Sequence, residues 1–189
     1  MNAFFSRVLA LHPDLEPVLP DAIRAFELLV NTFERGGKLL LCGNGGSAAD
    51  CEHLAAELVN KFERSRPISR QLQRELQLQF GDDGAFLGAH LQAALPAISL
   101  VSQGALVSAL ANDVDASLVF AQQVFAYAKP GDAHLAISTS GNSPNVLHAL
   151  RVARLLDVAT IGLTGRDGGA MRELCDVCLV VPREITAQI

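Results

Sequence analysis

Residues 39–47 read LLLCGNGGS and residues 135–143 read LAISTSGNS, and these two stretches carry the strongest signal in the chain. Each is an apolar run that passes into small polar residues where a helical pattern begins. Glycine lets the backbone come close to a ligand, and hydroxyls and exposed amides at a helix N-terminus donate hydrogen bonds to an anion. The first loop (residues 43–47) and the second loop (residues 138–143) therefore suggest a site for a phosphorylated ligand.

The rest of the chain repeats this alternation of strand and helix. Apolar runs predict buried strands at residues 38–42, 97–101, 133–138, 158–163 and 177–181. Helical patterns lie at residues 1–35, 47–62, 104–127, 143–156 and 168–174. Strands that are apolar on both faces and alternate with helices predict an α/β fold in three layers (αβα) around a five-stranded parallel sheet. In the flavodoxin-like strand order 2-1-3-4-5, both loops flank one crevice at the carboxyl ends of the strands.

Length and organisation predict a single domain over residues 1–189. Residues 1–35 form N-terminal helices in this interpretation. Residues 66–95 break the rhythm of strand and helix, because they read as two short helices joined by a Gly-Asp-Asp-Gly turn at residues 81–84. We interpret this segment as a helical insertion on a compact core.

Composition limits the classes of partner. Half of the residues are hydrophobic, 19% are charged, and the net charge is −5. An acidic chain without a basic stripe is not expected to bind nucleic acid. No apolar run reaches the length of a membrane span, so we expect no membrane partner, and the hydrophobic excess indicates buried helices or subunit contacts.

The four cysteines are Cys42, Cys51, Cys175 and Cys178. The last two have the C-x-x-C spacing of half a zinc site or of a redox pair. A second such pair is absent from the sequence, and this one begins an apolar strand pattern instead of preceding a helix, which favours a structural role. Buried free thiols fit a reducing cytoplasm.

The first loop does not match the common nucleotide-binding motifs. It lacks the Gly-Lys-Ser/Thr ending of a P-loop and the strict G-x-G-x-x-G pattern of a dinucleotide site. A strand-ending acidic residue to hold a ribose is also missing roughly twenty positions further on. By itself, the loop fits a tight turn as well as a ligand site.

The second loop is more specific, because it places four hydroxyl groups within six residues. They belong to Ser138, Thr139, Ser140 and Ser143. Pro144 follows, which suits Ser143 as the N-cap of a helix with proline at its first position. Capping accounts for one hydroxyl and leaves three, so a phosphate site is the favoured interpretation.

The helix predicted after the first loop carries His53 and Glu57 at i, i+4 spacing, on one face. Such a pair can bind a divalent metal or act in general acid–base catalysis, and it can also be an ordinary surface pair. Its position beside the predicted crevice favours a functional role. Asn112 and Asp113, taken alone, form a C-terminal turn of a helix. Residues 165–169 (GRDGG) indicate a turn that leads to a helix cap.

With these motifs in view, the chain resembles the sugar isomerase (SIS) domain family, and within it the phosphoheptose isomerases. The similar stretches are residues 42–50, 53–57, 111–113, 137–145 and 161–169. They occur in the family order and span most of residues 20–182. The resemblance implies a SIS fold and conversion of sedoheptulose 7-phosphate to D-glycero-D-manno-heptose 7-phosphate, an early step towards heptose and lipopolysaccharide precursors.

The resemblance also implies roles for individual residues. The phosphate would be held by Ser47, Ser138, Thr139, Ser140 and Ser143. The sugar would be lined by Asn44, Gly45, Gly46, Asn112 and Asp113. Glu57 would be the catalytic residue that moves the proton between C1 and C2 through an enediol. In some family members the residues that match His53 and Glu57 bind zinc, so zinc is the implied cofactor.

Two further expectations come from the resemblance. It implies a cytoplasmic homotetramer built through the N-terminal helices, with the segment 66–95 near the crevice or a subunit contact. Family members continue past the position of Ile189 with a helix that bears a glutamine and a histidine, so that helix is expected to be absent from residues 1–189. The alternative function is a non-catalytic SIS module that binds a sugar phosphate or docks a replication initiator.

Overall fold

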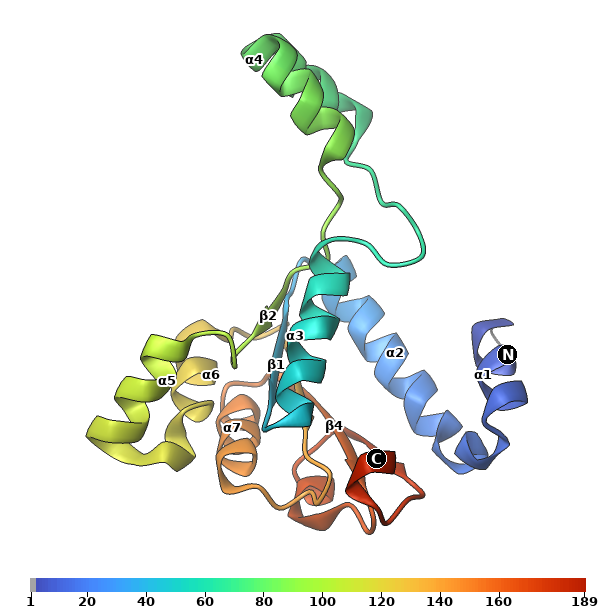
Figure 1. Cartoon of the computed structure of the whole chain (residues 1–189), viewed down its shortest axis with the longest axis vertical. Coiled ribbons are helices and arrows are strands. Elements are labelled where there is room, and N and C mark those ends of the chain that lie inside the picture. Colours follow the sequence, from blue (N-terminus) through green and yellow to red (C-terminus); the bar gives the residue numbers. More distant parts are fainter. Residues whose placement is uncertain (1–2) are drawn as a thin grey trace.

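The computed structural model describes residues 3–189 and contains a five-stranded parallel sheet in the order β2-β1-β3-β4-β5 (Figure 1). The strands are β1 (Leu39–Gly43), β2 (Ala97–Ser99), β3 (Ala133–Ile137), β4 (Ala159–Gly165) and β5 (Val177–Val181). All four neighbouring pairs are parallel. The predicted strand order is confirmed, and each predicted strand lies within two residues of an observed one.

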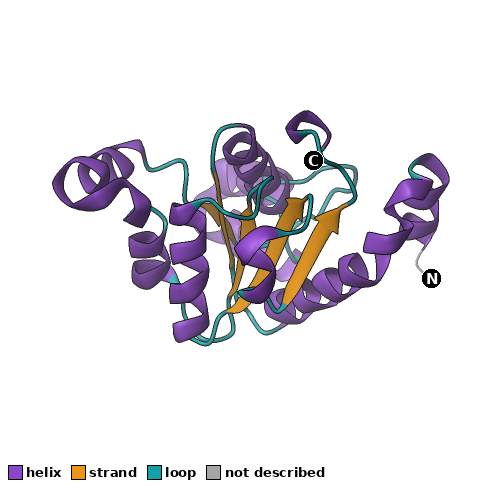
Figure 2. Cartoon of the chain, turned by 90° about the horizontal axis from the view of Figure 1, so that it is seen from below, coloured by secondary structure: helices purple, strands orange, loops and turns teal. Residues whose placement is uncertain are grey.

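Helices cover both faces of the sheet (Figure 2). The longer helices are α1 (Ala3–Leu11), α2 (Leu19–Glu34), α3 (Gly46–Val59), α4 (Arg70–His90), α5 (Gly104–Leu110), α6 (Ala121–Tyr127) and α7 (Pro144–Leu155). The alternation of side chains along β1 explains the layers: Leu40 and Cys42 join a core with α6 and α7, whereas Leu39 and Leu41 join a second core with α2 and α3. The three-layer αβα prediction is therefore confirmed.

The N-terminal helical prediction is correct in type but includes a break. Helix α1 ends at Leu11. The 3-10 segment η1 (Pro13–Val18), which contains Pro13 and Pro17, then leads into α2. Residues 1 and 2 of the predicted helical region lie outside the described residues. Gly36, in the left-handed conformation at φ 76°, follows closely on the end of α2.

The predicted helix at residues 104–127 is broken in the structure. After α5 the chain forms a wide π turn, η2 (Ala111–Asp115), and a 3-10 turn, η3 (Ala116–Leu118), before α6 begins. Asp115 has extended backbone angles, and its carboxylate accepts a hydrogen bond from the Ser117 amide at 2.7 Å. This local alternative to the helical hydrogen-bond ladder explains the break. Within residues 3–189 no single helix is long and apolar enough to cross a bilayer, although the bent pair Gly104–Leu118 and Ala121–Tyr127 meets the test on length and composition.

Helix α4 is a helical hairpin, as predicted for this segment. Its two arms meet at Gly81, which has φ 58° and ψ −128°. The arms pack closely, because a Cβ atom at Gly84 would lie 1.8 Å from the Leu76 carbonyl oxygen. The hairpin projects from the body between α3 and β2 (Figure 1), at the end of the sheet where the strands begin. It therefore lies at the opposite end of the sheet from the two loops. Of the two expected positions, the one beside the crevice is not seen within this chain, and the one at a subunit contact stays a prediction.

Candidate active site

The two loops meet at a cavity of about 280 Å³ at the carboxyl end of the sheet, as the strand order predicts. From the first loop and the start of α3, the lining residues are Asn44, Gly46, Ser47 and Asp50. The second loop contributes Thr139, and the remaining lining residues are Ile137, Leu163, Thr186, Ala187 and Ile189. The structure thus brings four of the predicted site residues, Asn44, Gly46, Ser47 and Thr139, into one cavity.

Glycines set the geometry of the first loop. Gly45 has φ 57° and ψ −121°, a conformation that L side chains rarely adopt, and it directly precedes α3. A Cβ atom at Gly43 would lie 2.8 Å from the Ser47 carbonyl oxygen, so only glycine lets the helix start this close to the strand. The tight-turn and ligand-site interpretations are compatible here, because the tight turn is what places Ser47 at the cavity.

A reciprocal amide pair ties the two loop regions together. Asn44 Nδ2 donates to Asn145 Oδ1 at 3.0 Å, and Asn145 Nδ2 donates to Asn44 Oδ1 at 2.9 Å. Asn145 lies in the first turn of α7, and 101 residues separate the partners along the chain. The predicted site residues did not include Asn145, because a contact over this separation leaves no local pattern.

The second loop is closed by its own hydroxyls. Ser138 Oγ and Ser143 Oγ lie 3.0 Å apart and share a hydrogen bond, and Ser140 Oγ accepts one from the Asn142 amide at 3.2 Å. Ser143 holds the N-cap position with Pro144 in the first turn, as predicted, but its side chain makes no capping bond. The Ser143 hydroxyl is instead directed into the loop, towards Ser138.

The turn at residues 165–169 packs against the second loop. Asn142 Oδ1 accepts a hydrogen bond from the Ala170 amide at 3.0 Å, and the Met171 amide donates to the Gly141 carbonyl at 3.0 Å. A Cβ atom at Gly141, which has φ 64°, would lie 2.0 Å from the Gly168 carbonyl oxygen. The predicted turn is present, and its function is to support the second loop.

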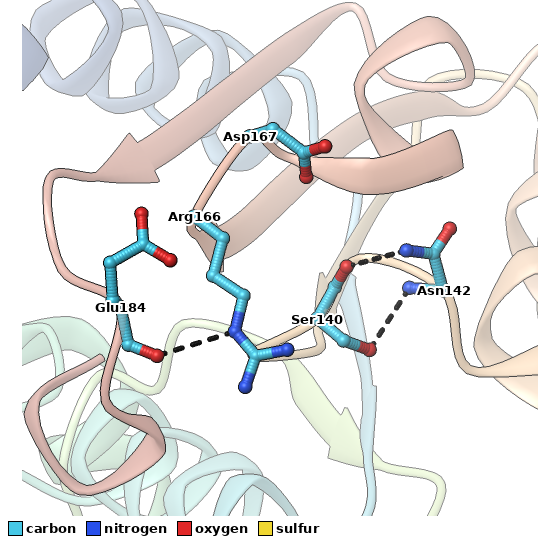
Figure 3. Close-up of a pocket in the computed structure, with 5 residues that line it drawn as sticks. All are labelled: Ser140, Asn142, Arg166, Asp167 and Glu184. Carbon is cyan, nitrogen blue, oxygen red and sulfur yellow. Dashed lines mark hydrogen bonds between the residues drawn. The ribbon is translucent and has the colours of Figure 1, made fainter.

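Arg166 brings a positive charge to a neighbouring cavity of about 390 Å³ (Figure 3). This cavity is lined by Ser140, Asn142, Arg166, Asp167 and Glu184. The Arg166 side chain lies between Glu184 and Ser140, and its Nε donates to the Glu184 carbonyl at 3.3 Å (Figure 3). The sequence interpretation gave Arg166 no ligand role, because it treated residues 165–169 as a turn.

Helix α3 carries a polar stripe away from the first cavity. Residues four, seven and eleven positions after Gly46 share its face of the helix, and these are Asp50, His53 and Glu57. His53 Nε2 lies 3.9 Å from Glu57 Oε1, with the two side chains 70% and 29% exposed. Glu57 Oε2 is buried and has no hydrogen-bond partner among the described residues. The same helical spacing was available to identify Asp50 from the sequence.

The C-terminal end of α3 is fixed just beyond Glu57. Arg66 Nη2 donates to the backbone carbonyls of Asn60 at 2.8 Å and Glu57 at 3.3 Å, and also to that of Leu58. The guanidinium thereby satisfies carbonyls that a helix end leaves without intrahelical partners. This capping holds the backbone at Glu57 in place.

Some predicted site residues lie apart from the cavity. Asn112 and Asp113 lie on η2, where Asn112 Nδ2 donates to Asp113 Oδ1 at 2.7 Å, and neither is among the residues that line the loop cavity. His53 and Glu57 also lie outside its lining within residues 3–189. Among those residues, no three His, Cys, Asp or Glu side chains gather closely enough to hold a metal ion.

His134 lies near the loops but is buried, so it cannot react with molecules in solution. His134 on β3 is fully buried, with Nδ1 3.1 Å from the Leu40 carbonyl oxygen and Nε2 3.5 Å from Cys42 Sγ. Burial lowers the pKa of His134 to about 4, so the ring is neutral at pH 7. His134 therefore supports the strand below the second loop and is not accessible to substrate.

Comparison with known proteins agrees with this geometry. The pattern of the SIS domain matches residues 3–78 and 85–165, and the gap falls at the turn of the α4 hairpin. A phosphoheptose isomerase from Pelobacter propionicus is 45% identical over 169 residues, which are 89% of this chain and 74% of the relative. One from Shewanella baltica is 39% identical over 189 residues, covering 98% of this chain and 83% of the relative.

Solved structures show the same likeness. A phosphoheptose isomerase from Francisella tularensis superposes with a TM-score of 0.76 at 32% identity, covering 97% of this chain and 84% of that chain. One from Neisseria gonorrhoeae gives a TM-score of 0.73 at 34% identity, covering 98% and 86%. The chain therefore belongs to the SIS domain family and, within it, to the phosphoheptose isomerases.

Proposed function

We propose that this chain isomerises sedoheptulose 7-phosphate to D-glycero-D-manno-heptose 7-phosphate, a step in heptose biosynthesis. The relatives described above support the reaction class. The observation that carries the assignment in this chain is the polar stripe on α3, which runs from the loop cavity to the buried, unpartnered carboxylate oxygen of Glu57. A phosphate anchor and a carboxylate base on one continuous surface are what an aldose–ketose isomerase requires.

The loops are proposed to bind the phosphate. Ser47 and Thr139 both line the cavity, and Ser138, Ser140 and Ser143 would supply hydroxyls beside the N-terminus of α7. The N-terminal end of that twelve-residue helix carries partial positive charge, which favours an anion. Asn44, Gly45 and Gly46 would lie next to the sugar hydroxyls, whereas Asn112 and Asp113 would need a movement of η2 to reach them.

The distance along α3 fits a sugar chain. Eleven residues separate Gly46 from Glu57, which is about 16 Å of helix axis. Helical side chains lean back towards the N-terminus, so Glu57 covers surface about one turn (about 5 Å) closer to the loops. The remaining span is comparable with the length of an extended seven-carbon sugar phosphate.

In this proposal Glu57 carries the proton. Glu57 removes a proton from C1 of the ketose while a second group, on the opposite side of the substrate, protonates the C2 carbonyl oxygen, giving an enediol. Glu57 then returns the proton to C2, and loss of the O1 hydroxyl proton produces the aldehyde. Its position beyond the cavity, with one carboxylate oxygen that has no hydrogen-bond partner in the described part of the chain, supports this role.

Zinc is the proposed cofactor, held in part by His53 and Glu57. The donor set fits, because imidazole nitrogen and carboxylate oxygen are common zinc ligands and the unpartnered Glu57 Oε2 has capacity for one more bond. Zinc, when bound, would polarise the substrate oxygens at C1 and C2. His53 and Glu57 would supply two of the zinc ligands.

We further propose a homotetramer in the cytoplasm. Phe4 on α1 is 63% exposed and Phe26 on α2 is 50% exposed, which gives the N-terminal helices an apolar outer surface. An apolar hollow of about 260 Å³ between α1 and the β5 edge, lined by residues such as Val8, Leu19 and Leu179, adds to it. All four cysteines are free thiols, which supports a reducing compartment.

An activity assay tests the proposal. The protein is incubated with sedoheptulose 7-phosphate, with and without added zinc, and NMR follows the appearance of the aldose H1 signal. Running the reaction in D2O should also place deuterium at C2, because the proton that the Glu57 carboxyl has taken from C1 exchanges with solvent before it is returned. Binding of sedoheptulose 7-phosphate without turnover in either condition would overturn the isomerase assignment and support the non-catalytic binding module.

A further inference from the structure

The C-x-x-C motif lies at the edge of the sheet, away from the loop cavity. Cys175 lies two residues before the start of the edge strand β5, and Cys178 is the second residue of that strand. Cys178 pairs in register with Gly162 of β4, so the Cys178 side chain and the open face of this glycine lie next to each other. Both cysteines are half-buried, whereas Cys42 and Cys51 are fully buried.

The two sulfur atoms converge over Gly162. A Cβ atom at Gly162 would lie 2.8 Å from Cys175 Sγ and 3.0 Å from Cys178 Sγ. Glycine at this position therefore provides the space that lets both thiols occupy one spot on the sheet. The side chains of Cys175 and Cys178 also hydrogen-bond to each other.

The surroundings make the two thiols unequal. The hydrogen bond from Cys175, assisted by the Arg172 guanidinium, lowers the pKa of Cys178, while the same hydrogen bond and burial raise the pKa of Cys175. A more acidic thiol beside a less acidic one is the arrangement of an attacking and a resolving cysteine. Burial raises the pKa of Cys51 to about 12, which keeps that thiol protonated.

We propose that Cys175 and Cys178 form a reversible dithiol–disulfide couple that is oxidised by hydrogen peroxide. The Cys178 thiolate attacks one peroxide oxygen, the O–O bond breaks, and the departing hydroxide takes a proton to become water. Cys175 then attacks the sulfur of the resulting Cys178 sulfenic acid, an S–S bond forms, and a second water leaves with the Cys175 proton. Two thiols are oxidised, and one peroxide is reduced to two waters.

Peptide mapping tests the couple with an internal control. Cleavage after Arg172 and Arg183 gives a peptide of residues 173–183 that contains both cysteines, and cleavage after Lys38 and Lys61 gives residues 39–61 with Cys42 and Cys51. The intact protein is treated with hydrogen peroxide, unfolded, alkylated and digested. We expect the 173–183 peptide to lose two hydrogens and escape alkylation, reversibly with dithiothreitol, while the 39–61 peptide stays alkylated at both positions.

Single variants then test the two roles. In Cys175→Ser, Cys178 should still be oxidised but should proceed to sulfinic acid, because no resolving thiol remains. In Cys178→Ser, Cys175 should react with peroxide at least tenfold more slowly than Cys178 does in the wild type. Equal oxidation of the 39–61 peptide, a fully alkylated 173–183 peptide after peroxide, or equal reactivity of the two single variants would each overturn the proposal.

Discussion

The second loop and the polar pair on α3 differ in how their polar side chains are bonded. In the loop, Ser138 and Ser143 bond each other, and Asn142 bonds the Ala170 amide. Glu57, in contrast, has a long contact of 3.9 Å to His53 and a buried oxygen without a partner among residues 3–189. The loop is organised before a ligand arrives, whereas the carboxylate is left free for one.

Under the proposed function, this difference separates the residues that bind the substrate from the residue that carries out the chemistry. A preorganised loop loses little conformational entropy when the phosphate binds, so it can fix the substrate. An unpartnered buried carboxylate oxygen costs folding free energy, and that cost is recovered only when a substrate or metal bonds to it. Changes in the loop should therefore alter stability and affinity, and changes at Glu57 should lower turnover far more than they lower affinity.

The largest expected effect is that of Glu57→Gln. Loss of the general base should lower kcat by about 10²–10⁴-fold, because the amide cannot accept the C1 proton. Thermal stability should not fall, since glutamine keeps the shape and removes a buried charge. The matched control is Glu52→Gln on the same helix, where an exposed carboxylate bonds Ser102 Oγ. A drop in substrate affinity as large as the drop in kcat would contradict the division between a binding loop and a catalytic Glu57.

The next effect is that of Gly141→Ala in the second loop. The added Cβ would lie 2.0 Å from the Gly168 carbonyl oxygen, at a left-handed φ of 64°. Overpacking costs about 1–3 kcal/mol and the left-handed backbone about 1–2 kcal/mol. Urea unfolding should show this loss together with weaker binding of the substrate. Gly104→Ala serves as the control, because none of residues 3–189 comes within 4 Å of its Cβ position apart from its chain neighbours and its own helix. Equal stability of both variants would show that the loop is not tightly packed.

The smallest effect is expected for Ser143→Ala. Removing this hydroxyl leaves the nearly buried Ser138 hydroxyl without its partner at 3.0 Å. The loss should be about 1 kcal/mol in stability and a similar amount in binding, or about fivefold in Kd, with kcat at saturation retained. Calorimetric titration with the substrate measures the affinity. Ser108→Ala, on the exposed side of α5, should change neither quantity; a fall in kcat without a change in Kd would assign Ser143 to catalysis instead.

The strands and loops were predictable because their signals are local. A run such as residues 133–138 is apolar on both faces, which parallel strands buried between helices require, and β3 occupies residues 133–137. The order of the strands followed from general rules for α/β sheets, and it placed both loops at one cavity. Glycine and hydroxyl residues at a strand end marked Ser47 and Thr139 directly.

The missed features depend on contacts that are distant in the sequence. The Asn44–Asn145 pair joins residues 101 positions apart, and Arg166 reaches its cavity only because residues 165–169 fold against the second loop. The break at Asp115 was missed for a different reason, since a single carboxylate there competes with the helical ladder. The spacing of apolar residues in 104–127 carries no information about a side chain that hydrogen-bonds to the backbone.

The base of the α4 hairpin has a consequence for the chain's tolerance of added length. Pro67 and Gln92 form an antiparallel bridge, and the Arg66 amide donates to Gln92 Oε1 at 2.8 Å, so the two ends of the hairpin are fastened together. The entropy cost of connecting α3 to β2 is therefore that of a short loop, and it does not depend on how much chain lies beyond the bridge. This junction is a natural graft point, where a reporter or a whole foreign domain could replace the hairpin without disturbing the parallel sheet.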